Sequence, residues 1–409
     1  MTQLRSLFLA AASFGTILSA QGAFAQGFTV TGSYGSRDLL GGFPSDGSSD
    51  EAEVQLSYAG QGPRLGYNLA VTVGDDDDSV DFDDSFVEAY AGGFAFGLGA
   101  VDRNWSPSRF SSLILSDNAD PIPSAYVVKR QYTAFDTPWL SWIGPWKGEF
   151  FVGQTDSDGN PDNTKLMGMR LQLQPVDGFE IDLVRTAQWG GDGRSESLKT
   201  FLDVLTGDTN EGEASEANQL AGIGLSWTLP EEIAPLRLYA QAVGEDESGG
   251  LPSCFMYLAG VEGVGTAFGL PTTVTLEGAT TEISDSENGF CGPGTAYNNN
   301  AYPGGYTHHE DVMGMPMDTD SRMAQLIIEH QLARFALDWS VGYYEINTTN
   351  RPDHRLSSTE VDGTILRVGA SQSWGDTTLR GGVAWQSFDL DNDDIDAGMG
   401  VSFSVSRTF

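Results

Sequence analysis

Short stretches in which apolar and polar residues alternate run through this chain, and they constrain its fold more than any other feature. In the clearest, apolar side chains at 399, 401, 403 and 405 alternate with serines at 402, 404 and 406. Successive side chains of a β-strand point to opposite faces, so the pattern predicts a two-faced strand that ends at Phe409. A barrel wall needs such strands when lipid lies outside it and water inside.

Other segments of the chain follow the same period, and none of them sustains a helical stripe. We expect strands near 28–35, 52–60, 64–74, 84–93, 94–104, 126–135, 148–156, 166–175, 179–189, 219–229, 236–244, 256–263, 271–280, 322–331, 335–346, 364–374, 377–388 and 397–409. These predicted strands make an even number, about eighteen, as closed bacterial barrels have. The fold class predicted is all-β, a transmembrane antiparallel barrel.

The connections between these strands alternate in length. Short turns are expected near 60–64, 92–95, 174–178, 331–336 and 373–377, and long ones near 36–51, 105–125, 190–218, 245–256, 280–320 and 349–363. Outer-membrane barrels have short periplasmic turns and long external loops. A soluble β-sandwich would not show this rhythm behind an export signal.

The first 25 residues have the pattern of such a signal. Arg5 precedes an apolar stretch at 7–18, and Ala-Phe-Ala at 23–25 fits a cleavage site. The apolar stretch is shorter than the ~20 residues that a membrane-spanning helix needs. We therefore predict a signal peptide at 1–25 and a single barrel domain at 26–409, located in the outer membrane.

The charge of the chain excludes one class of partner. Asp and Glu number 57 against 21 Lys and Arg, for a formal net charge of −36. Nucleic-acid binding requires basic patches, so it is not expected. The acidic clusters are typical of solvated loops between strands, and a halophilic or marine origin explains the excess equally well.

Motifs for catalysis or for a cofactor are not found. The chain has no GxSxG, HExxH or Walker sequence, so we expect neither an enzyme nor a cofactor. His308, His309 and Glu310 could bind a metal, but adjacent side chains seldom converge on one ion, so an ordinary loop is expected. The aspartate runs at 75–84 and 391–396 lack the glycine and the terminal glutamate of an EF-hand loop, which favours solvated loops over a Ca²⁺ site.

Two further local features carry predictions. Cys254 and Cys291 are the only cysteines, and in an oxidising compartment they are expected to form a disulfide that ties two external loops. Residues 195–205 place Leu198, Phe201 and Leu202 at helical spacing after a serine. They predict either a short helix over the barrel mouth or a loop packed on itself.

The connection at 101–123 is too apolar for an exposed loop. Residues 113–115 are Leu-Ile-Leu, and the segment also contains Ile122 and three prolines. We therefore expect this loop to fold into the lumen. Arg103, Trp105 and Arg109 stand in it. An aromatic face beside planar polar groups suits a sugar ring, although chemistry alone favours a Trp105 that fills a plug core and an Arg103 that satisfies buried carbonyls.

This segment begins a series of motifs that resembles the Wzi-type capsule assembly family. The others are DTPWLSWIGPW (136–146), MGMRLQLQP (167–175), RTAQWGGDGR (185–194), EANQLAG (216–222) and YTHHEDVMGMPMDTDS (306–321). The resemblance implies an eighteen-stranded outer-membrane barrel that acts as a lectin and retains capsular polysaccharide, and not the export pore. Some members of that family have a helical bundle before the first strand, and 27–51 leaves no room for one.

The resemblance and the sugar-compatible chemistry together select the expected polysaccharide-binding residues. They are Arg103, Trp105, Arg109, Trp189, Arg194, Tyr306, His308 and His309. The expected partners are surface polysaccharide and the lipid and lipopolysaccharide of the outer membrane, with the protein as a monomer. The alternative function is a general or cation-preferring diffusion porin. A third, an outer-membrane polysaccharide deacylase or lyase, has no supporting set of residues.

Overall fold

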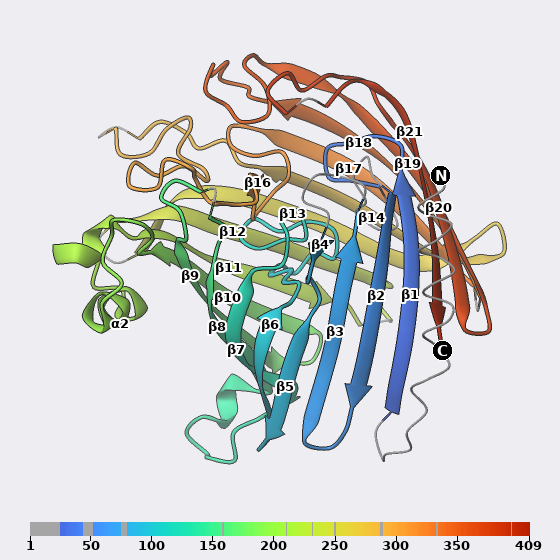
Figure 1. The fold of residues 1–409 in the computed structure, drawn as a ribbon, viewed down its shortest axis with the longest axis horizontal. Helices are drawn as coiled ribbons and strands as arrows, with labels where there is room; N and C mark the ends of the chain where they lie inside the picture. Colours follow the sequence, from blue (N-terminus) through green and yellow to red (C-terminus); the bar gives the residue numbers. More distant parts are fainter. Residues whose placement is uncertain are drawn as a thin grey trace.

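The computed structural model describes most of the chain. It covers residues 25–43, 52–74, 80–157, 159–209, 211–230, 232–248, 251–286, 289–332, 334–393 and 395–409. The predicted signal peptide, apart from its last residue, and the aspartates at 75–78 lie outside these ranges. Within them, one antiparallel sheet closes on itself as a barrel (Figure 1).

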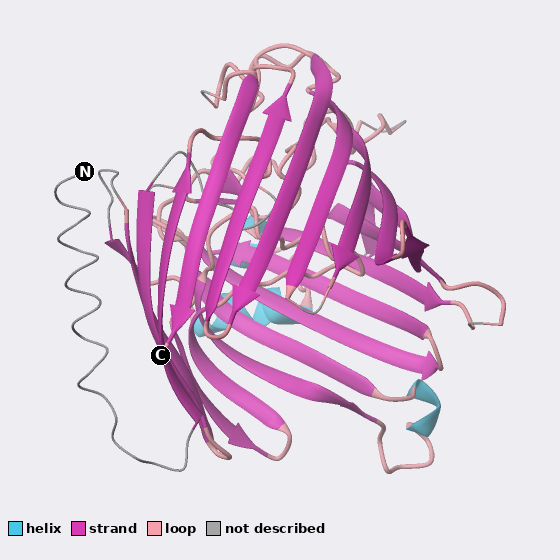
Figure 2. Cartoon of the chain, turned by 90° about the vertical axis from the view of Figure 1, so that its right-hand side faces the viewer, coloured by secondary structure: helices cyan, strands magenta, loops and turns pink. Residues whose placement is uncertain are grey.

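Eighteen strands of the described residues form the barrel wall, as the alternation predicts. They are β1 (Ala25–Gly35), β2 (Ala52–Gln61), β3 (Leu65–Val73), β5 (Phe86–Ala91), β6 (Phe94–Ala100), β7 (Pro123–Thr133), β8 (Trp146–Gln154), β9 (Lys165–Val176), β10 (Phe179–Trp189), β11 (Asn218–Thr228), β12 (Leu236–Ser248), β13 (Leu251–Ala267), β14 (Leu270–Thr280), β17 (Arg322–Gln331), β18 (Phe335–Ile346), β19 (Val361–Trp374), β20 (Thr377–Gln386) and β21 (Gly398–Thr408). The two-residue β4 (Val80–Asp81) only extends the pairing of β3. The strands tilt around the barrel axis (Figure 2).

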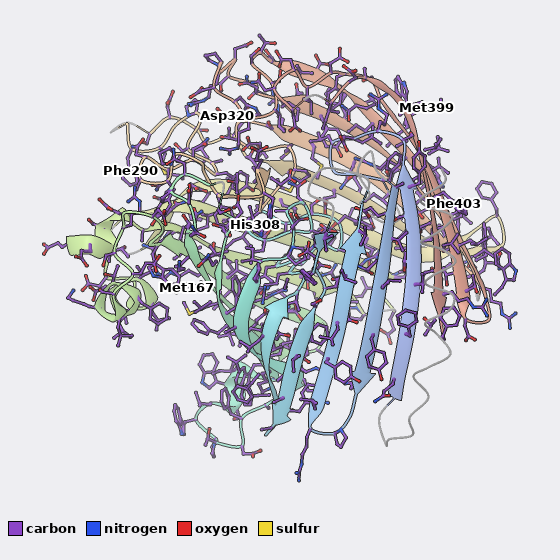
Figure 3. The ribbon with its side chains drawn as sticks, in the orientation of Figure 1. Met167, Phe290, His308, Asp320, Met399 and Phe403 are labelled. Carbon is purple, nitrogen blue, oxygen red and sulfur yellow. A yellow bond between two sulfur atoms is a disulfide. The ribbon has the colours of Figure 1, made fainter. Side chains whose placement is uncertain are left out.

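The last strand closes the barrel against the first. β21 pairs with β1 from Thr29↔Thr408 to Gly35↔Ser402. Met399 and Phe403 point outward and are 68% and 50% exposed, whereas Ser402 and Ser404 are buried inside (Figure 3). The predicted two-faced terminal strand is confirmed, and its apolar face belongs to an apolar outer surface that continues around the wall on Leu183, Leu276 and Val368.

The two ends of the barrel differ as expected. The short-turn end has tight connections such as Asp177–Gly178 between β9 and β10, and a longer one at 134–145 with the 3₁₀ helix η1 (Ser141–Ile143). The long-loop end has 101–122, 190–217 and 281–321. One predicted long connection, at 245–256, is wrong. Strand β12 continues to Ser248 and β13 begins at Leu251, so the two strands pair through most of this segment. The backbone pairing of the β12–β13 hairpin therefore extends beyond the ends of the other strands of the wall.

The long loops contain the remaining elements. Residues 190–217 form the helix α2 (Leu198–Thr206) and the 3₁₀ helix η2 (Gly212–Glu216), and 281–321 contain the small hairpin β15 (Thr307–His308) and β16 (Asp311–Val312). The helix predicted at 195–205 is confirmed, with the Ser197 side chain accepting from the Thr200 N–H as its N-cap. No helix of the described residues is both long and apolar enough to cross a bilayer.

The core of the molecule lies inside the barrel. Residues 101–122, which we call the plug, bury Leu113, Ile114 and Leu115 against inward-facing wall residues. Residues 281–321, which we call the cap loop, bury Tyr297 and Met315 in the same cluster. The predicted inward loop is therefore confirmed, and its packed side chains fill much of the lumen. A cavity of about 440 Å³, lined by Gly66, Asn68, Glu88 and Arg130 among others, remains toward the short-turn end.

Candidate functional site

Arg103 anchors the start of the plug to the wall. Its guanidinium donates to Glu149 Oε1 on β8 at 2.7 Å and to Ser124 Oγ on β7 at 3.0 Å. It also lies over the Phe151 ring, 4.1 Å from its centroid. A buried arginine needs such partners, because an unpaired buried charge is costly. Arg103 is thus fully engaged within the protein.

Trp105 fills the space beside Arg103. Its ring meets Phe151 edge to face at 5.5 Å, and a Cβ on Gly168 of β9 would approach it to 2.7 Å. Gln241 of β12 holds the backbone on both sides, donating to Trp105 O at 2.6 Å and accepting from Leu113 N at 3.0 Å. The tryptophan is 1% exposed, so it packs the plug core.

A second group of wall residues holds the far side of the plug. Glu277 of β14 accepts from Ser108 and Ser111, and from the Tyr239 hydroxyl at 2.7 Å. Arg170 of β9 donates to Asn104 O at 3.0 Å while it pairs with Asp182 at 2.6 Å. Residues of strands between β7 and β14 therefore bind the plug from several sides. Sequence reasoning did not select these wall residues.

Arg109 lies toward the short-turn end. Its guanidinium pairs with Glu262 of β13 at 3.0 Å and Glu329 of β17 at 2.5 Å, both close to short turns. Half of its side chain is exposed. The structure therefore places Arg109 at the opposite end of the barrel from the cap loop.

Trp189 lies on the outside of the wall. On β10, Thr186 and Gln188 point inward, where Thr186 accepts from Tyr306 at 2.9 Å and Gln188 donates to Gly305 O at 3.2 Å. Ala187 and Trp189 alternate with them and face outward. Trp189 packs against Phe201 of α2 at 5.4 Å, so α2 covers the outer wall. The predicted location over the barrel mouth is wrong for this helix.

Arg194 and Tyr306 join two long loops at the long-loop end. The Arg194 guanidinium pairs with Glu216 at 2.6 Å, donates to Ala301 O and lies 4.8 Å from the centroid of Tyr302. Tyr306 is buried, and its ring stacks on Tyr297 at 6.2 Å. The first residue reaches the surface, while the second holds the cap loop against the wall.

His308 and His309 stand side by side at the turn of the β15–β16 hairpin, with ring centroids 4.3 Å apart. His308 is buried, and its Nδ1 accepts from the Asp156 N–H at 3.2 Å (Figure 3). Desolvation, reinforced by the neighbouring His309, lowers the pKa of His308. His309 is exposed. Among the described residues, no group of three or more His, Cys, Asp or Glu side chains gathers as metal ligands would.

The predicted disulfide is confirmed. Cys254 and Cys291 are bonded across 37 residues, with their Cα atoms 5.3 Å apart. Cys254 lies in β13 near the β12–β13 turn, and Cys291 lies in the cap loop. The bond therefore ties the cap loop to the extended hairpin of the wall.

Acidic side chains from separate loops meet at the long-loop end in a group that we call the acidic rim. It consists of Asp38, Asp81, Asp83, Asp84, Asp102, Asp117, Asp120, Glu310, Asp311 and Asp393. Desolvation, together with Asp393 and Asp120, raises the pKa of Asp311 to about 7. Desolvation and nearby carboxylates also raise the pKa of Asp83 to about 7. Sequence reasoning did not foresee this meeting of loops.

These features agree with a known family. Residues 9–398 match the family model described as capsule assembly protein Wzi. The chain belongs to the Wzi family of capsule assembly proteins. This Wzi-family chain is an outer-membrane barrel. Because such barrels have short periplasmic turns and long external loops, we assign its long-loop end to the outside of the cell.

Individual relatives agree with this assignment. An uncharacterized 55.8 kDa protein in the cps region of Klebsiella pneumoniae is 37% identical over 168 residues, which are 41% of this chain and 33% of that protein. The match thus spans about a third of the relative's length. The structure of Wzi from Escherichia coli, an outer-membrane carbohydrate-binding barrel involved in group 1 capsule assembly, superposes with a TM-score of 0.81 and 24% identity. The alignment covers 93% of this chain and 84% of that one, and shows the shared fold.

A more distant solved barrel, OccD3 of Pseudomonas aeruginosa, has a TM-score of 0.52 at 10% identity, over 95% of this chain and 91% of its own. It shares the barrel architecture only. Of the eight residues predicted to bind polysaccharide in this Wzi-family chain, Arg194, Tyr306, His308 and His309 come together in the external loops. Arg103, Trp105 and Arg109 belong to the plug, with the Arg109 side chain at its short-turn end, and Trp189 lies on the outer face of the wall.

Proposed function

We propose that this protein is a surface lectin that binds capsular or exopolysaccharide with its external loops and retains it at the cell. The observation that carries the proposal is the division of the barrel into two parts. The plug and the cap loop pack buried side chains into the lumen, while polar side chains such as exposed His309 and partly exposed Arg194 stand on the external loops.

Within this surface, the contact between 155–164 and the β15–β16 hairpin is the favoured binding region. Gly304 donates to Asn160 O at 3.0 Å, and the Asp156 N–H contact with His308 fixes the two loops side by side. Exposed His309 presents its imidazole there, and the amides of Gln154 and Asn163, which bond to each other at 2.9 Å, lie at the base of the neighbouring 155–164 connection. Such groups suit sugar hydroxyls.

The buried candidates act indirectly in this proposal. Arg103 and Trp105 hold the plug, and Tyr306 and His308 hold the cap loop, so they keep the external loops in position. Arg194 keeps a partly exposed guanidinium beside the Tyr302 ring and is the second candidate for direct contact. The proposal includes binding and no catalysis.

The first test is a deletion strain scored for polymer on the cells and polymer in the medium. We expect release into the medium with unchanged total synthesis. Loss of small-solute uptake with normal surface polymer would instead favour the porin.

The second test measures binding of purified protein to the polymer isolated from the same strain. His309→Ala and Arg194→Ala should weaken binding, whereas Arg64→Ala, an exposed arginine at the short-turn end, should leave it unchanged. Equal loss in all three variants, or no binding by the wild type, would contradict the lectin proposal.

A further inference from the structure

Helix α2 rests on the outer face of the barrel wall. Its buried residue Val204 joins Met167 of β9 and Ala187 and Trp189 of β10 in one apolar cluster. In Figure 1 the helix lies outside the ring of strands, beside β8 to β10. A helix in this position borders the same outer surface that faces lipid further down the wall.

The apolar side of α2 is wider than its contact with the wall. Leu198 and Leu202, one turn apart, are 73% and 47% exposed. They continue the apolar side formed by Phe201 and Leu205, which pack partly on the wall. The wall therefore leaves two neighbouring leucines of this helix uncovered.

The polar side of α2 faces the opposite way. Thr200 bonds to Ser195 and Glu213 in the external loop, and Lys199 pairs with Asp203 on the solvent side. Successive helix positions are rotated by about 100°, so the uncovered leucines lie on the side of the helix away from this loop.

Arg185 marks the boundary between the helix and the lipid-facing wall. It points outward from β10, and its guanidinium donates to Val204 O at 2.6 Å and Leu205 O at 3.1 Å, two carbonyls in the last turn of α2. The next outward pair down the wall, Leu183 and Leu171, is apolar and exposed. The C-terminal end of α2 therefore lies next to the point where the exposed apolar surface of the wall begins.

We propose that α2 is an interfacial helix that immerses Leu198 and Leu202 in the acyl chains of the outer leaflet. Its polar side stays in water, and Arg185 is satisfied by helix carbonyls and Gln219 and so does not face lipid. The proposal rests on the membrane position of the barrel and not on sugar binding, so it can fail independently of the lectin proposal.

The test uses an environment-sensitive fluorophore on single introduced cysteines, attached without reduction so that the Cys254–Cys291 disulfide stays closed. Leu202→Cys, Leu198→Cys, Lys199→Cys and Phe403→Cys are each reconstituted into vesicles with a quencher on the lipid acyl chains. We expect the labels at 198 and 202 to lose fluorescence almost as strongly as the label at 403 in the lipid-facing wall. The label at 199, on the polar side of the same helix, should lose much less.

Equal quenching at 199 and 202 would overturn the proposal. So would self-quenching at 202 that grows with protein density, because it would assign this side of the helix to a second copy of the chain. Each variant is first checked as a folded barrel by its migration in an unheated gel. If one leucine variant does not fold, the other provides the same comparison.

Discussion

Single polar side chains on the inner wall hold the plug in place. Gln241 satisfies a carbonyl and an N–H of the plug together, and Glu277 accepts from two plug serines. These groups are buried, so each bond excludes water as well as fixing a position. A substitution on the outer wall would change the contact with lipid. A substitution that shortens one of these inner side chains would remove the hydrogen bonds that hold the plug.

Gln241→Ala should lower the free energy of unfolding by about 1–3 kcal/mol, because it leaves the Trp105 carbonyl and the Leu113 N–H buried without partners. The measurement is the urea midpoint of the folded barrel in detergent. Gln55→Ala, an inward glutamine of β2 whose bonds to Thr72 and Asp84 are long, serves as the matched control and should shift the midpoint less. A shift no larger than that of the control would show that Gln241 does not hold the plug.

Asp83 and Asp311 make the external end sensitive to pH. With each pKa raised to about 7, both carboxyls are largely ionised at pH 8 and largely protonated at pH 5. An acidic polysaccharide should therefore bind more tightly as pH falls through 7, because the acidic rim repels it less.

Binding of an acidic polymer at a series of pH values checks this expectation. Asp311→Asn should reduce the pH dependence, and Asp177→Asn, at a short turn, should not change it. A neutral polymer should show little dependence in any variant. Binding of the acidic polymer that strengthens as pH rises would contradict the argument.

At the level of elements, the disulfide connects two structures of different kinds, a wall hairpin and a loop. Closing a loop of 37 residues restricts the unfolded chain by about 4 kcal/mol in the chain-entropy model. Cys254→Ser with Cys291→Ser should therefore lower the urea midpoint and expose the cap loop to protease before the wall unfolds. Equal protease resistance of the oxidised protein and the double variant would show that the cap loop is held by its other contacts.

The strands of the wall could be predicted from sequence. Each strand has lipid on one side and the packed lumen on the other, so its residue types alternate with a period of two. All eighteen strands follow from that period. The position of α2 could not be predicted in this way, because a helical spacing shows an apolar side but not which surface it covers. Trp189 shows the difficulty, since it lies at the end of β10 where only the inward contacts of Thr186 and Gln188 reveal that it faces out.

The candidate site was less accessible to sequence reasoning. Arg103 and Trp105 were selected by residue type, yet their partners Glu149 and Phe151 come from strand β8 of the wall. The wall residues that grip the plug read as ordinary inward polar positions of strands. The acidic rim is made by separate loops whose meeting depends on the closed barrel.

At the scale of the whole molecule, the packed lumen predicts a barrel that conducts poorly. Purified protein in planar bilayers should show no large steady conductance. Replacing residues 104–120 by a glycine-serine linker of equal length should produce channels, because apolar plug residues would no longer fill the lumen. Large steady conductance of the unaltered protein would overturn the packed-lumen interpretation and favour the porin.

The plug also dictates an order of events during biogenesis. It lies between β6 and β7, but its partners Gln241 and Glu277 stand 136 and 169 residues beyond the plug residues that they hold. The ring is sealed by β1 and β21, the two ends of the domain. Because the plug makes these contacts inside the closed ring, we expect it to enter while the seam between β1 and β21 is still open. An assembly factor that joined β1 to β21 too early would leave a barrel whose plug lies outside the lumen.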